Sequence, residues 1–351
     1  MKAARWHGRH DVRIEEVPEP SPKPGQVKIK VHYCGICGTD LHEYIEGPMF
    51  IAEQPHPLTG YGAPVIIGHE YAGEIVELGE GVTGWQVGDR VALEGYWVCF
   101  DCYYCERHEY NRCVGLAFHG MSAPGGLAEY VCAPTYQLYA VDPSVSREAS
   151  ALVEPIAVSV RAVNRTAPKL GENAIIIGAG PIGLAILQVL RAAGIERIAV
   201  VEPSRKRREM AGEFGAKLIL DPAQDDVQQA SAEMTRGIGF DMAFECAGVD
   251  QAYQTAVNTT RKGARICLVS QTNQPFRLFV NDIGFGEREL IGTVAYCGEF
   301  ATAIDLIASG KVRAADMITA KIPLEQLVSV GYHELMHNSA NQVKIIVDPW
   351  A

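Results

Sequence analysis

Apolar and polar positions follow two different rhythms along the chain. In roughly the first 150 residues, short segments rich in Val, Ile and Leu at residues 27–31, 73–78 and 90–93 are separated by glycines and prolines. Runs of this length and spacing predict short strands. Many short strands in close succession are typical of a β-barrel, so we expect the first part of the chain to be β-rich.

Beyond Pro168 the apolar segments become longer and alternate between two patterns. Aliphatic runs predict strands, the segments between them predict helices, and the chain returns to a mixed pattern from about residue 293. The predicted strands are 174–177, 198–201, 217–220, 240–245 and 264–269, and the predicted helices are 182–193 and 205–214. This alternation is typical of a doubly wound parallel sheet, so we predict an α/β fold with two domains.

Composition excludes several classes of partner. A net charge of -11 disfavours binding to nucleic acid and to anionic membranes. The uncharged run at residues 174–190 is broken by glycines and a proline and is shorter than the ~20 residues that a membrane span needs. The first residues become charged at once and lack an apolar segment, so we expect neither a secretory signal nor a transit peptide and a cytoplasmic location.

Four cysteines form the most specific local pattern in the chain. Cys99, Cys102, Cys105 and Cys113 have the spacing C-x2-C-x2-C-x7-C. Four closely spaced thiolates suit one tetrahedral zinc ion with no open position, which predicts a structural zinc site. The small number of cysteines for this length disfavours a disulfide scaffold and agrees with a reducing compartment.

A glycine motif follows the first strand of the predicted parallel sheet. The segment Gly178-Ala179-Gly180-Pro181-Ile182-Gly183 joins that strand to an apolar helix, which is the setting in which G-x-G-x-x-G binds a dinucleotide. In such a motif the first glycine makes a tight turn, the second admits the pyrophosphate and the third lets helix and strand pack closely. We therefore predict cofactor contacts at Gly178, Gly180, Pro181, Ile182 and Gly183.

The identity of the dinucleotide depends on an acidic residue at the end of the next strand. Glu202 lies about twenty residues after the motif, where a carboxylate can accept hydrogen bonds from the adenosine ribose and repel a 2′-phosphate. This predicts NAD rather than NADP. Arg205 or Arg207 could instead accommodate a 2′-phosphate or contact the cofactor, and we include Arg207 among the candidate cofactor residues.

A second group of residues has the chemistry of a catalytic metal site. Cys37 and the pair His69-Glu70 offer sulfur, imidazole and carboxylate, and Glu154 offers a second carboxylate. A catalytic zinc ion uses three protein ligands and keeps one position open, so either Glu70 or Glu154 could be the third ligand. The residues alone leave that choice open.

Taken together, these motifs resemble one enzyme superfamily over essentially the whole chain. The segments Cys34-Gly-Ile-Cys-Gly-Thr-Asp-Leu-His42 and Gly68-His69-Glu70, the four-cysteine lobe and the glycine motif follow the order found in zinc-dependent medium-chain alcohol dehydrogenases. The resemblance implies a GroES-like β-barrel catalytic domain over residues 1–155, a Rossmann NAD-binding domain over 156–294 and a return to the catalytic domain over 295–351.

The resemblance also implies roles for the site residues. Cys37, His69 and Glu154 would hold the catalytic zinc, with Glu70 behind them or exchanging with Glu154. Asp40 would orient the imidazole of His69. The hydroxyl proton of the substrate would leave through Thr39, the nicotinamide ribose and His42, and the enzyme would bind two zinc ions per chain and NAD.

Within the superfamily, the loop with Pro55-His56-Pro57-Leu58-Thr59 and Ala63-Pro64-Val65 looks like that of 2,3-butanediol dehydrogenases. The expected reaction is the interconversion of 2,3-butanediol and acetoin, so the partner is a small diol or hydroxyketone. Sorbitol-like polyol dehydrogenases and L-threonine 3-dehydrogenases are the alternatives within the same chemistry. A non-catalytic sensor of the NAD redox state is an alternative of another class. Relatives suggest a homodimer or homotetramer.

Overall fold

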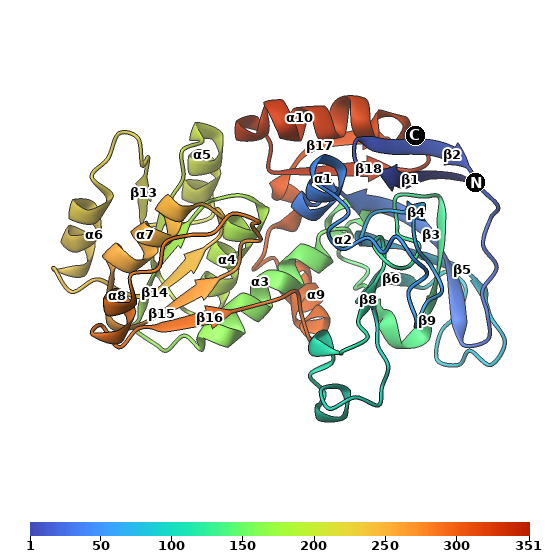
Figure 1. Ribbon diagram of the computed structural model, residues 1–351, viewed down its shortest axis with the longest axis horizontal. Coiled ribbons are helices and arrows are strands. Elements are labelled where there is room, and N and C mark those ends of the chain that lie inside the picture. The colour runs from blue at the N-terminus through green and yellow to red at the C-terminus, as the bar shows by residue number, and fades with distance from the viewer. The chain divides into compact units, whose positions relative to one another are not determined.

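The protein divides into two compact units in a computed structural model that describes residues 1–351 (Figure 1). The first unit comprises Met1–Glu154, Phe300–Ala308 and Ala314–Ala351. The second unit comprises Pro155–Glu299 and Ser309–Arg313. The tail of the chain therefore belongs mostly to the same unit as its first half.

The first unit is built on β-sheets. Its largest sheet has seven strands in the order β10-β6-β5-β3-β18-β17, and β9 pairs with β3 as well. These strands are β3 (Gln26–Gly35), β5 (Glu70–Leu78), β6 (Arg90–Leu93), β9 (Tyr130–Pro134), β10 (Leu138–Ala140), β17 (Ile318–Pro323) and β18 (Lys344–Asp348). The three-stranded sheet β2-β1-β4 contains β1 (Lys2–Gly8), β2 (Asp11–Glu16) and β4 (Val65–Ile66), and β7 (Tyr96–Trp97) pairs with β8 (Ala117–Phe118).

Few helices belong to this unit. They are α1 (Gly38–Ile45), α2 (Arg147–Ser150), α9 (Phe300–Ala308), α10 (His333–His337) and a π-helical segment at Leu327–Tyr332. Single 3-10 turns occur at Cys105–Arg107, Tyr110–Arg112, Thr135–Gln137, Ala314–Met317, Leu324–Gln326 and Ser339–Asn341.

The core of the first unit lies around β3 and β5. Val27, Ile29 and Val31 of β3 are fully buried, and Ile75 of β5 packs in the same cluster. β3 pairs antiparallel with β5, β9 and β18, so strands from both ends of the chain meet on it. The apolar runs predicted as strands at residues 27–31, 73–78 and 90–93 all lie within this sheet.

The second unit contains one sheet of six parallel strands in the order β13-β12-β11-β14-β15-β16. Its strands are β11 (Asn173–Ile177), β12 (Arg197–Val201), β13 (Leu218–Leu220), β14 (Phe240–Glu245), β15 (Thr260–Leu268) and β16 (Glu289–Gly292). Its helices are α4 (Pro181–Ala192), α5 (Arg205–Glu213), α6 (Val227–Thr235), α7 (Asp250–Thr259) and α8 (Val280–Gly284), while α3 (Val153–Thr166) begins at the boundary with the first unit.

Strands of this sheet are buried on both faces. Every residue of β11 is buried, which explains why its sequence is a continuous aliphatic run rather than an alternating one. Strand and helix alternate along the chain as the sequence predicts, and the predicted α/β fold class is confirmed. The longest helix, α3, has 14 residues, and no helix combines the length and the apolar character that crossing a bilayer requires.

Candidate active site

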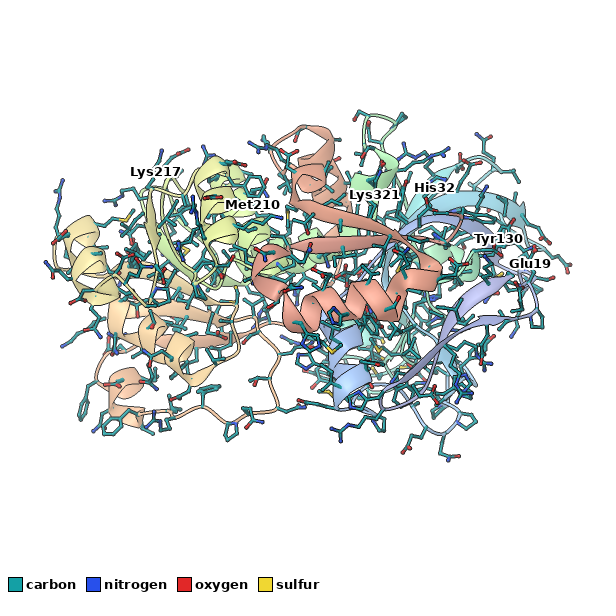
Figure 2. The ribbon with its side chains drawn as sticks, turned by 90° about the horizontal axis from the view of Figure 1, so that it is seen from above. Glu19, His32, Tyr130, Met210, Lys217 and Lys321 are labelled. Atoms are coloured by element: carbon teal, nitrogen blue, oxygen red, sulfur yellow. The ribbon has the colours of Figure 1, made fainter.

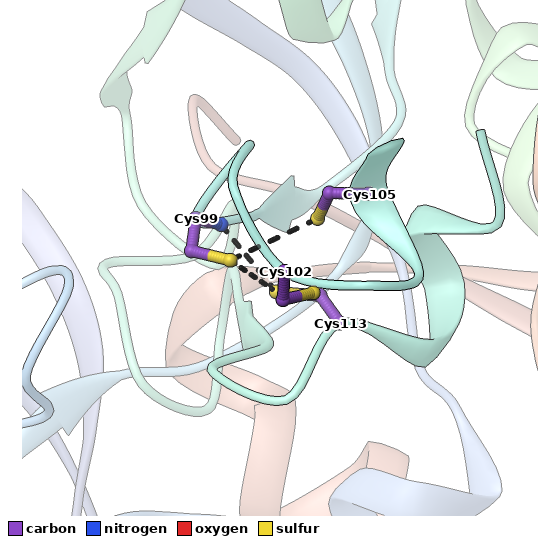
Figure 3. A group of neighbouring side chains, drawn as sticks. All are labelled: Cys99, Cys102, Cys105 and Cys113. Carbon is purple, nitrogen blue, oxygen red and sulfur yellow. Dashed lines mark hydrogen bonds between the residues drawn. The ribbon is translucent and has the colours of Figure 1, made fainter. Parts of the chain in front are cut away.

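The four cysteines of the C-x2-C-x2-C-x7-C pattern converge in a lobe between β7 and β8 (Figure 3). Their sulfur atoms all lie within 4.8 Å of one another. Cys99 Sγ is 3.5 Å from Cys113 Sγ and 3.9 Å from Cys105 Sγ. A tetrahedral zinc ion with Zn–S bonds of about 2.3 Å separates its sulfurs by about 3.8 Å, so the lobe has the dimensions of a closed zinc site.

One thiol of the lobe, that of Cys102, has a lowered pKa. Backbone amides of Cys105 and Val114 stabilise the thiolate of Cys102 and lower its pKa to about 6. The thiolate is the form that binds zinc. All ten cysteines of the chain are free thiols, so the sulfurs of the lobe are not consumed in disulfides.

Cys37, His69 and Glu70 form a second cluster in the first unit, and their ligand atoms also lie within 4.8 Å of one another. Cys37 is the N-cap residue of α1 and lies two residues beyond the end of β3. Glu70 opens β5 and pairs with Gly35 at the end of β3, so the register of the two strands brings the three residues together. His69 and Glu70 are 5% and 2% exposed.

Asp40 lies beside the imidazole of this cluster. Its Oδ2 atom accepts a hydrogen bond from the backbone amide of Cys37 at 2.9 Å. Its Oδ1 atom is 3.6 Å from His69 Nδ1, and both of these buried atoms lack a hydrogen bond. Burial raises the pKa of Asp40, which the charge of His69 opposes. This arrangement is the one in which a carboxylate can orient a metal-binding histidine.

Glu154 lies at the start of α3, is 6% exposed and does not belong to the compact group of ligand atoms. Burial raises the pKa of the Cys37 thiol well above its usual value, and the charges of Glu70 and, more weakly, Glu154 raise it further. The carboxylate that the resemblance puts behind the metal is therefore the one that the fold brings nearest to Cys37 and His69.

The cluster fits a divalent cation on the chemistry of its donors. Three carboxylates, from Asp40, Glu70 and Glu154, are buried near the half-buried thiol of Cys37 and the imidazole of His69. Among these acids Glu70 has a buried ammonium partner, Lys344, and a further cation is favourable here, because an uncompensated buried charge is strongly unfavourable. Sulfur, imidazole and carboxylate are ligands that zinc accepts.

Sequence reasoning missed one member of this site. Lys344, the first residue of β18, is 2% exposed, and its Nζ donates to Glu70 Oε2 at 2.5 Å and to the carbonyl oxygen of Ile36 at 3.0 Å. Burial lowers the pKa of Lys344, but Glu70 and Cys37 more than offset this and raise it. A lysine that opens an apolar strand is the only signal in the sequence, and it does not reveal the partner.

Thr39 and His42 lie half-buried on α1 near the cluster. The Sγ atom of Cys37 is 3.5 Å from Thr39 Oγ1, which puts the hydroxyl next to a metal ligand candidate. Both side chains can accept and donate protons.

The glycine motif in the second unit has the geometry of a dinucleotide-binding turn. Gly178 has φ +95°, a conformation that favours glycine, and a Cβ at Gly183 would collide with the carbonyl oxygen of Gly178. Open space surrounds the position that a Cβ of Gly180 would take. α4 begins at Pro181, next to Ile182, so the amino end of the helix faces this open backbone, where a pyrophosphate fits.

Glu202 follows β12 and is 3% exposed. Its carboxylate accepts hydrogen bonds from the backbone amide of Ala179 at 2.6 Å and from that of Ser204 at 2.8 Å. The acid therefore contacts the glycine motif directly. Burial lowers the pKa of Arg207, and Glu202 opposes this change. Arg205 is exposed and pairs with Glu209.

Comparison with known proteins agrees with this geometry. Residues 23–143 match the family of alcohol dehydrogenase GroES-like domains, and residues 181–309 match the zinc-binding dehydrogenase family. The chain therefore belongs to the zinc-dependent medium-chain alcohol dehydrogenase superfamily, and it is a zinc-dependent dehydrogenase.

Individual relatives are similar over their full length. An (R,R)-butanediol dehydrogenase of Neisseria gonorrhoeae is 40% identical, with 99% of each chain covered. A crystal structure of 2R,3R-butanediol dehydrogenase from Bacillus subtilis is 41% identical, with a TM-score of 0.92 and 99% of each chain covered. A structure of an alcohol dehydrogenase from Escherichia coli CFT073, complexed with NADH, is 27% identical with a TM-score of 0.90 and 99% of each chain covered.

Proposed function

We propose that the protein interconverts 2,3-butanediol and acetoin with NAD as the hydride acceptor. The observation that carries this proposal is the compact cluster of Cys37, His69 and Glu70 in a chain that is similar over its whole length to two (R,R)-butanediol dehydrogenases. An R-configured carbinol carbon is the expected site of oxidation. Glu202, buried against the glycine motif, supports NAD over NADP.

The proposed metal ligands are Cys37 and His69 together with a carboxylate from Glu70 or Glu154, and a second zinc ion belongs to the cysteine lobe. When bound, the catalytic zinc supplies a positive charge that lowers the pKa of a substrate hydroxyl, and NAD supplies the hydride acceptor. Asp40 holds the His69 ring in one orientation. The chain otherwise contributes positioning, which is a major source of rate enhancement in such reactions.

Two residues of α1 move the proton. Thr39 Oγ1 would accept the proton of the substrate hydroxyl as it gives up its own, and that proton would reach solvent by way of the nicotinamide ribose and the imidazole of His42. The proton and the hydride together account for the two hydrogens that the alcohol loses. Both residues lie on the same short helix that Cys37 caps, so one local element positions the relay and the metal ligand.

The loop that resembles butanediol dehydrogenases is held firmly by the fold. The carboxylate of Glu43, 1% exposed, accepts backbone amides from Met49 at 3.0 Å, from Ile51 at 3.2 Å and from Phe50. Thr59 donates to the carbonyl oxygen of Ser122, on the far side of the loop. These hydrogen bonds hold two points of the segment between Gly47 and Pro64 in defined positions, which supports specific positioning of a small diol.

Steady-state kinetics test the proposal. The purified chain is assayed with NAD and each stereoisomer of 2,3-butanediol, with NADH and acetoin, and with sorbitol and L-threonine. We expect the highest kcat/KM with the (R,R) diol and with acetoin, and no turnover in a Cys37→Ser control. A clear preference for sorbitol or threonine would reject the substrate assignment.

A non-catalytic sensor is the alternative of another class, and the second ligand cluster argues against it. Zinc content separates the two: the enzyme binds two ions per chain, whereas a sensor stabilised by the lobe binds one. We also propose a cytoplasmic location, with which the free thiols of the lobe agree. The proposed assembly is a homodimer or a homotetramer. Light scattering after size-exclusion chromatography measures the oligomeric state.

A further inference from the structure

One acid of the Cys37 cluster, Glu70, is paired with a buried lysine, Lys344. Lys344 and Glu70 are 274 residues apart in the chain, and each is 2% exposed. The strand pairing that joins them is fixed, because β18 pairs antiparallel with the end of β3, with Ile346 opposite Gly35. The amide of Ile36 also donates to the carbonyl oxygen of Ile345 at 3.0 Å.

Glu70 is confined from two sides. Lys344 Nζ binds its Oε2 atom, and the same oxygen lies against the backbone of Gly35, where any Cβ would collide with it. These two contacts hold the carboxylate of Glu70 next to the ammonium group of Lys344. One of its oxygens is occupied by Lys344, although the ligand atoms of Glu70, Cys37 and His69 form a single compact group.

We infer that Lys344 is an internal cation that competes with the catalytic metal for Glu70 and so keeps one coordination position free for substrate. This inference rests on the proposed function, in which Cys37 and His69 hold that metal. A carboxylate oxygen that accepts a hydrogen bond from an ammonium group is a weaker metal ligand than a free one. Glu154 then serves as the carboxylate ligand at rest, and Glu70 binds the metal only when it leaves Lys344.

Charge balance supports this role. If Cys37, Asp40, Glu70 and Glu154 are all ionised, a divalent metal and Lys344 offset three of the four negative charges. Without the lysine, the metal is the only cation that can compensate Glu70 inside the protein. Because a buried carboxylate without a partner is strongly destabilised, Glu70 would then bind the metal permanently.

Substitution of Lys344 tests the inference through metal exchange rather than through activity. Lys344→Met removes the charge and keeps most of the volume, Lys344→Gln keeps a neutral donor, and Lys344→Arg keeps the charge. Lys28→Met is the matched control, because Lys28 is also buried, at 8% exposed, and pairs with Glu19 at 2.8 Å and Glu77 at 2.6 Å. The ammonium group of Lys28 lies over the ring of Tyr130, and Lys28 is near the opposite end of β3 from Gly35. Figure 2 labels Glu19 and Tyr130.

The first measurement is the rate at which zinc leaves the loaded full-length protein for a chromogenic chelator. The phase that is absent from Cys37→Ser reports the catalytic site. In Lys344→Met we expect this phase to slow about tenfold, the effect of one charge-assisted hydrogen bond, while Lys344→Arg and Lys28→Met stay within about twofold of the wild type. If Lys344→Met fails to fold, Lys344→Gln is measured instead and is expected to slow in the same direction.

The second measurement is the visible absorption of the protein with cobalt in the same site. We expect Lys344→Met to have weaker d–d bands than the wild type, because an added carboxylate raises the coordination number. Unchanged bands together with an unchanged or faster release phase would overturn the inference and leave Lys344 a structural residue. If the wild type lacks a release phase that depends on Cys37, the proposed function fails instead, so the two failures are distinguishable.

Discussion

The cysteine lobe should depend on its metal for local structure, and Cys102→Ser is the sharpest perturbation of it. The lobe lies between Cys99 and Cys113 and contains only two single 3-10 turns. Its apolar side chains face solvent: Phe100 is 63% exposed and Tyr103 is 62% exposed. A segment with so little buried surface has no core of its own, so the bound metal must replace one.

The expected loss of zinc affinity follows from dividing a typical binding free energy among the four sulfurs. The binding free energy of a structural zinc ion in zinc-finger peptides is about 10–16 kcal/mol at neutral pH. Shared among four ligands, this is about 3 kcal/mol for each sulfur, or roughly a hundredfold in affinity. Cys102 is the most informative choice because its pKa, lowered to about 6 by backbone amides, makes it a thiolate at neutral pH without the metal.

The assay combines metal content with hydrogen exchange. In Cys102→Ser we expect one zinc per chain rather than two after dialysis against a weak chelator, and fast amide exchange across residues 99–113. Protection of the parallel sheet in the second unit should not change. Cys132→Ser is the control, because Cys132 is a half-buried cysteine on β9 that belongs to neither ligand cluster.

Two results would refute this reasoning. A Cys102→Ser protein that retains two zinc ions per chain would mean that the lobe does not need all four sulfurs. A protein that loses one zinc but keeps its protection at residues 99–113 would mean that the lobe is held by its other contacts. One of these is the hydrogen bond from Tyr110 to the buried carboxylate of Glu94, at 2.7 Å.

Three further predictions concern the catalytic cluster, the cofactor and acid stability. Cys37→Ser should lower kcat by at least about a hundredfold, because substitution of a group that only hydrogen-bonds to a metal ligand can already cost that much. NAD binding measured by calorimetry should be retained, and an equal loss of NAD binding would contradict the division between the metal site and the cofactor site. Glu202→Gln should raise the ratio of kcat/KM for NADP to that for NAD by about tenfold, since it removes a charge beside the ribose site; an unchanged ratio would show that Glu202 does not select the cofactor. Burial lowers the pKa of His32, which is 8% exposed, to about 4, so the unfolded chain binds a proton between about pH 6.5 and pH 4 that the folded protein does not. Stability should therefore fall by up to about 3 kcal/mol as pH drops through that window. Urea unfolding at pH 7 and pH 4.5 should show a smaller loss in His32→Gln, and equal losses would refute the assignment.

Local patterns in the sequence were sufficient for the features whose parts are close together in the chain. The fold class followed from apolar rhythm, because a strand buried on both faces, such as β11, must be aliphatic throughout. The cysteine lobe followed from spacing, because its four ligands lie within one short loop. Gly178 and Gly183 were identified by the motif, and the left-handed turn and the close packing there are backbone requirements that glycine meets.

Contacts between distant segments of the chain could not be predicted from the sequence. Glu70 and Glu154 are both acids that could bind a metal, and only the pairing of Glu70 with Gly35 shows which one the fold brings into the compact group. Lys344 was not identified at all, because its partner is set by the pairing of β18 with β3.

The sequence by itself determined the ligand types, the dinucleotide turn and the alternation of strands and helices, because each is encoded in residues a few positions apart. Tertiary structure alone decided which carboxylate lies nearest the sulfur and the imidazole and which cation faces it. The physical reason is strand register: antiparallel pairing fixes which side chains of distant segments share one buried space, and burial then makes their charges depend on one another.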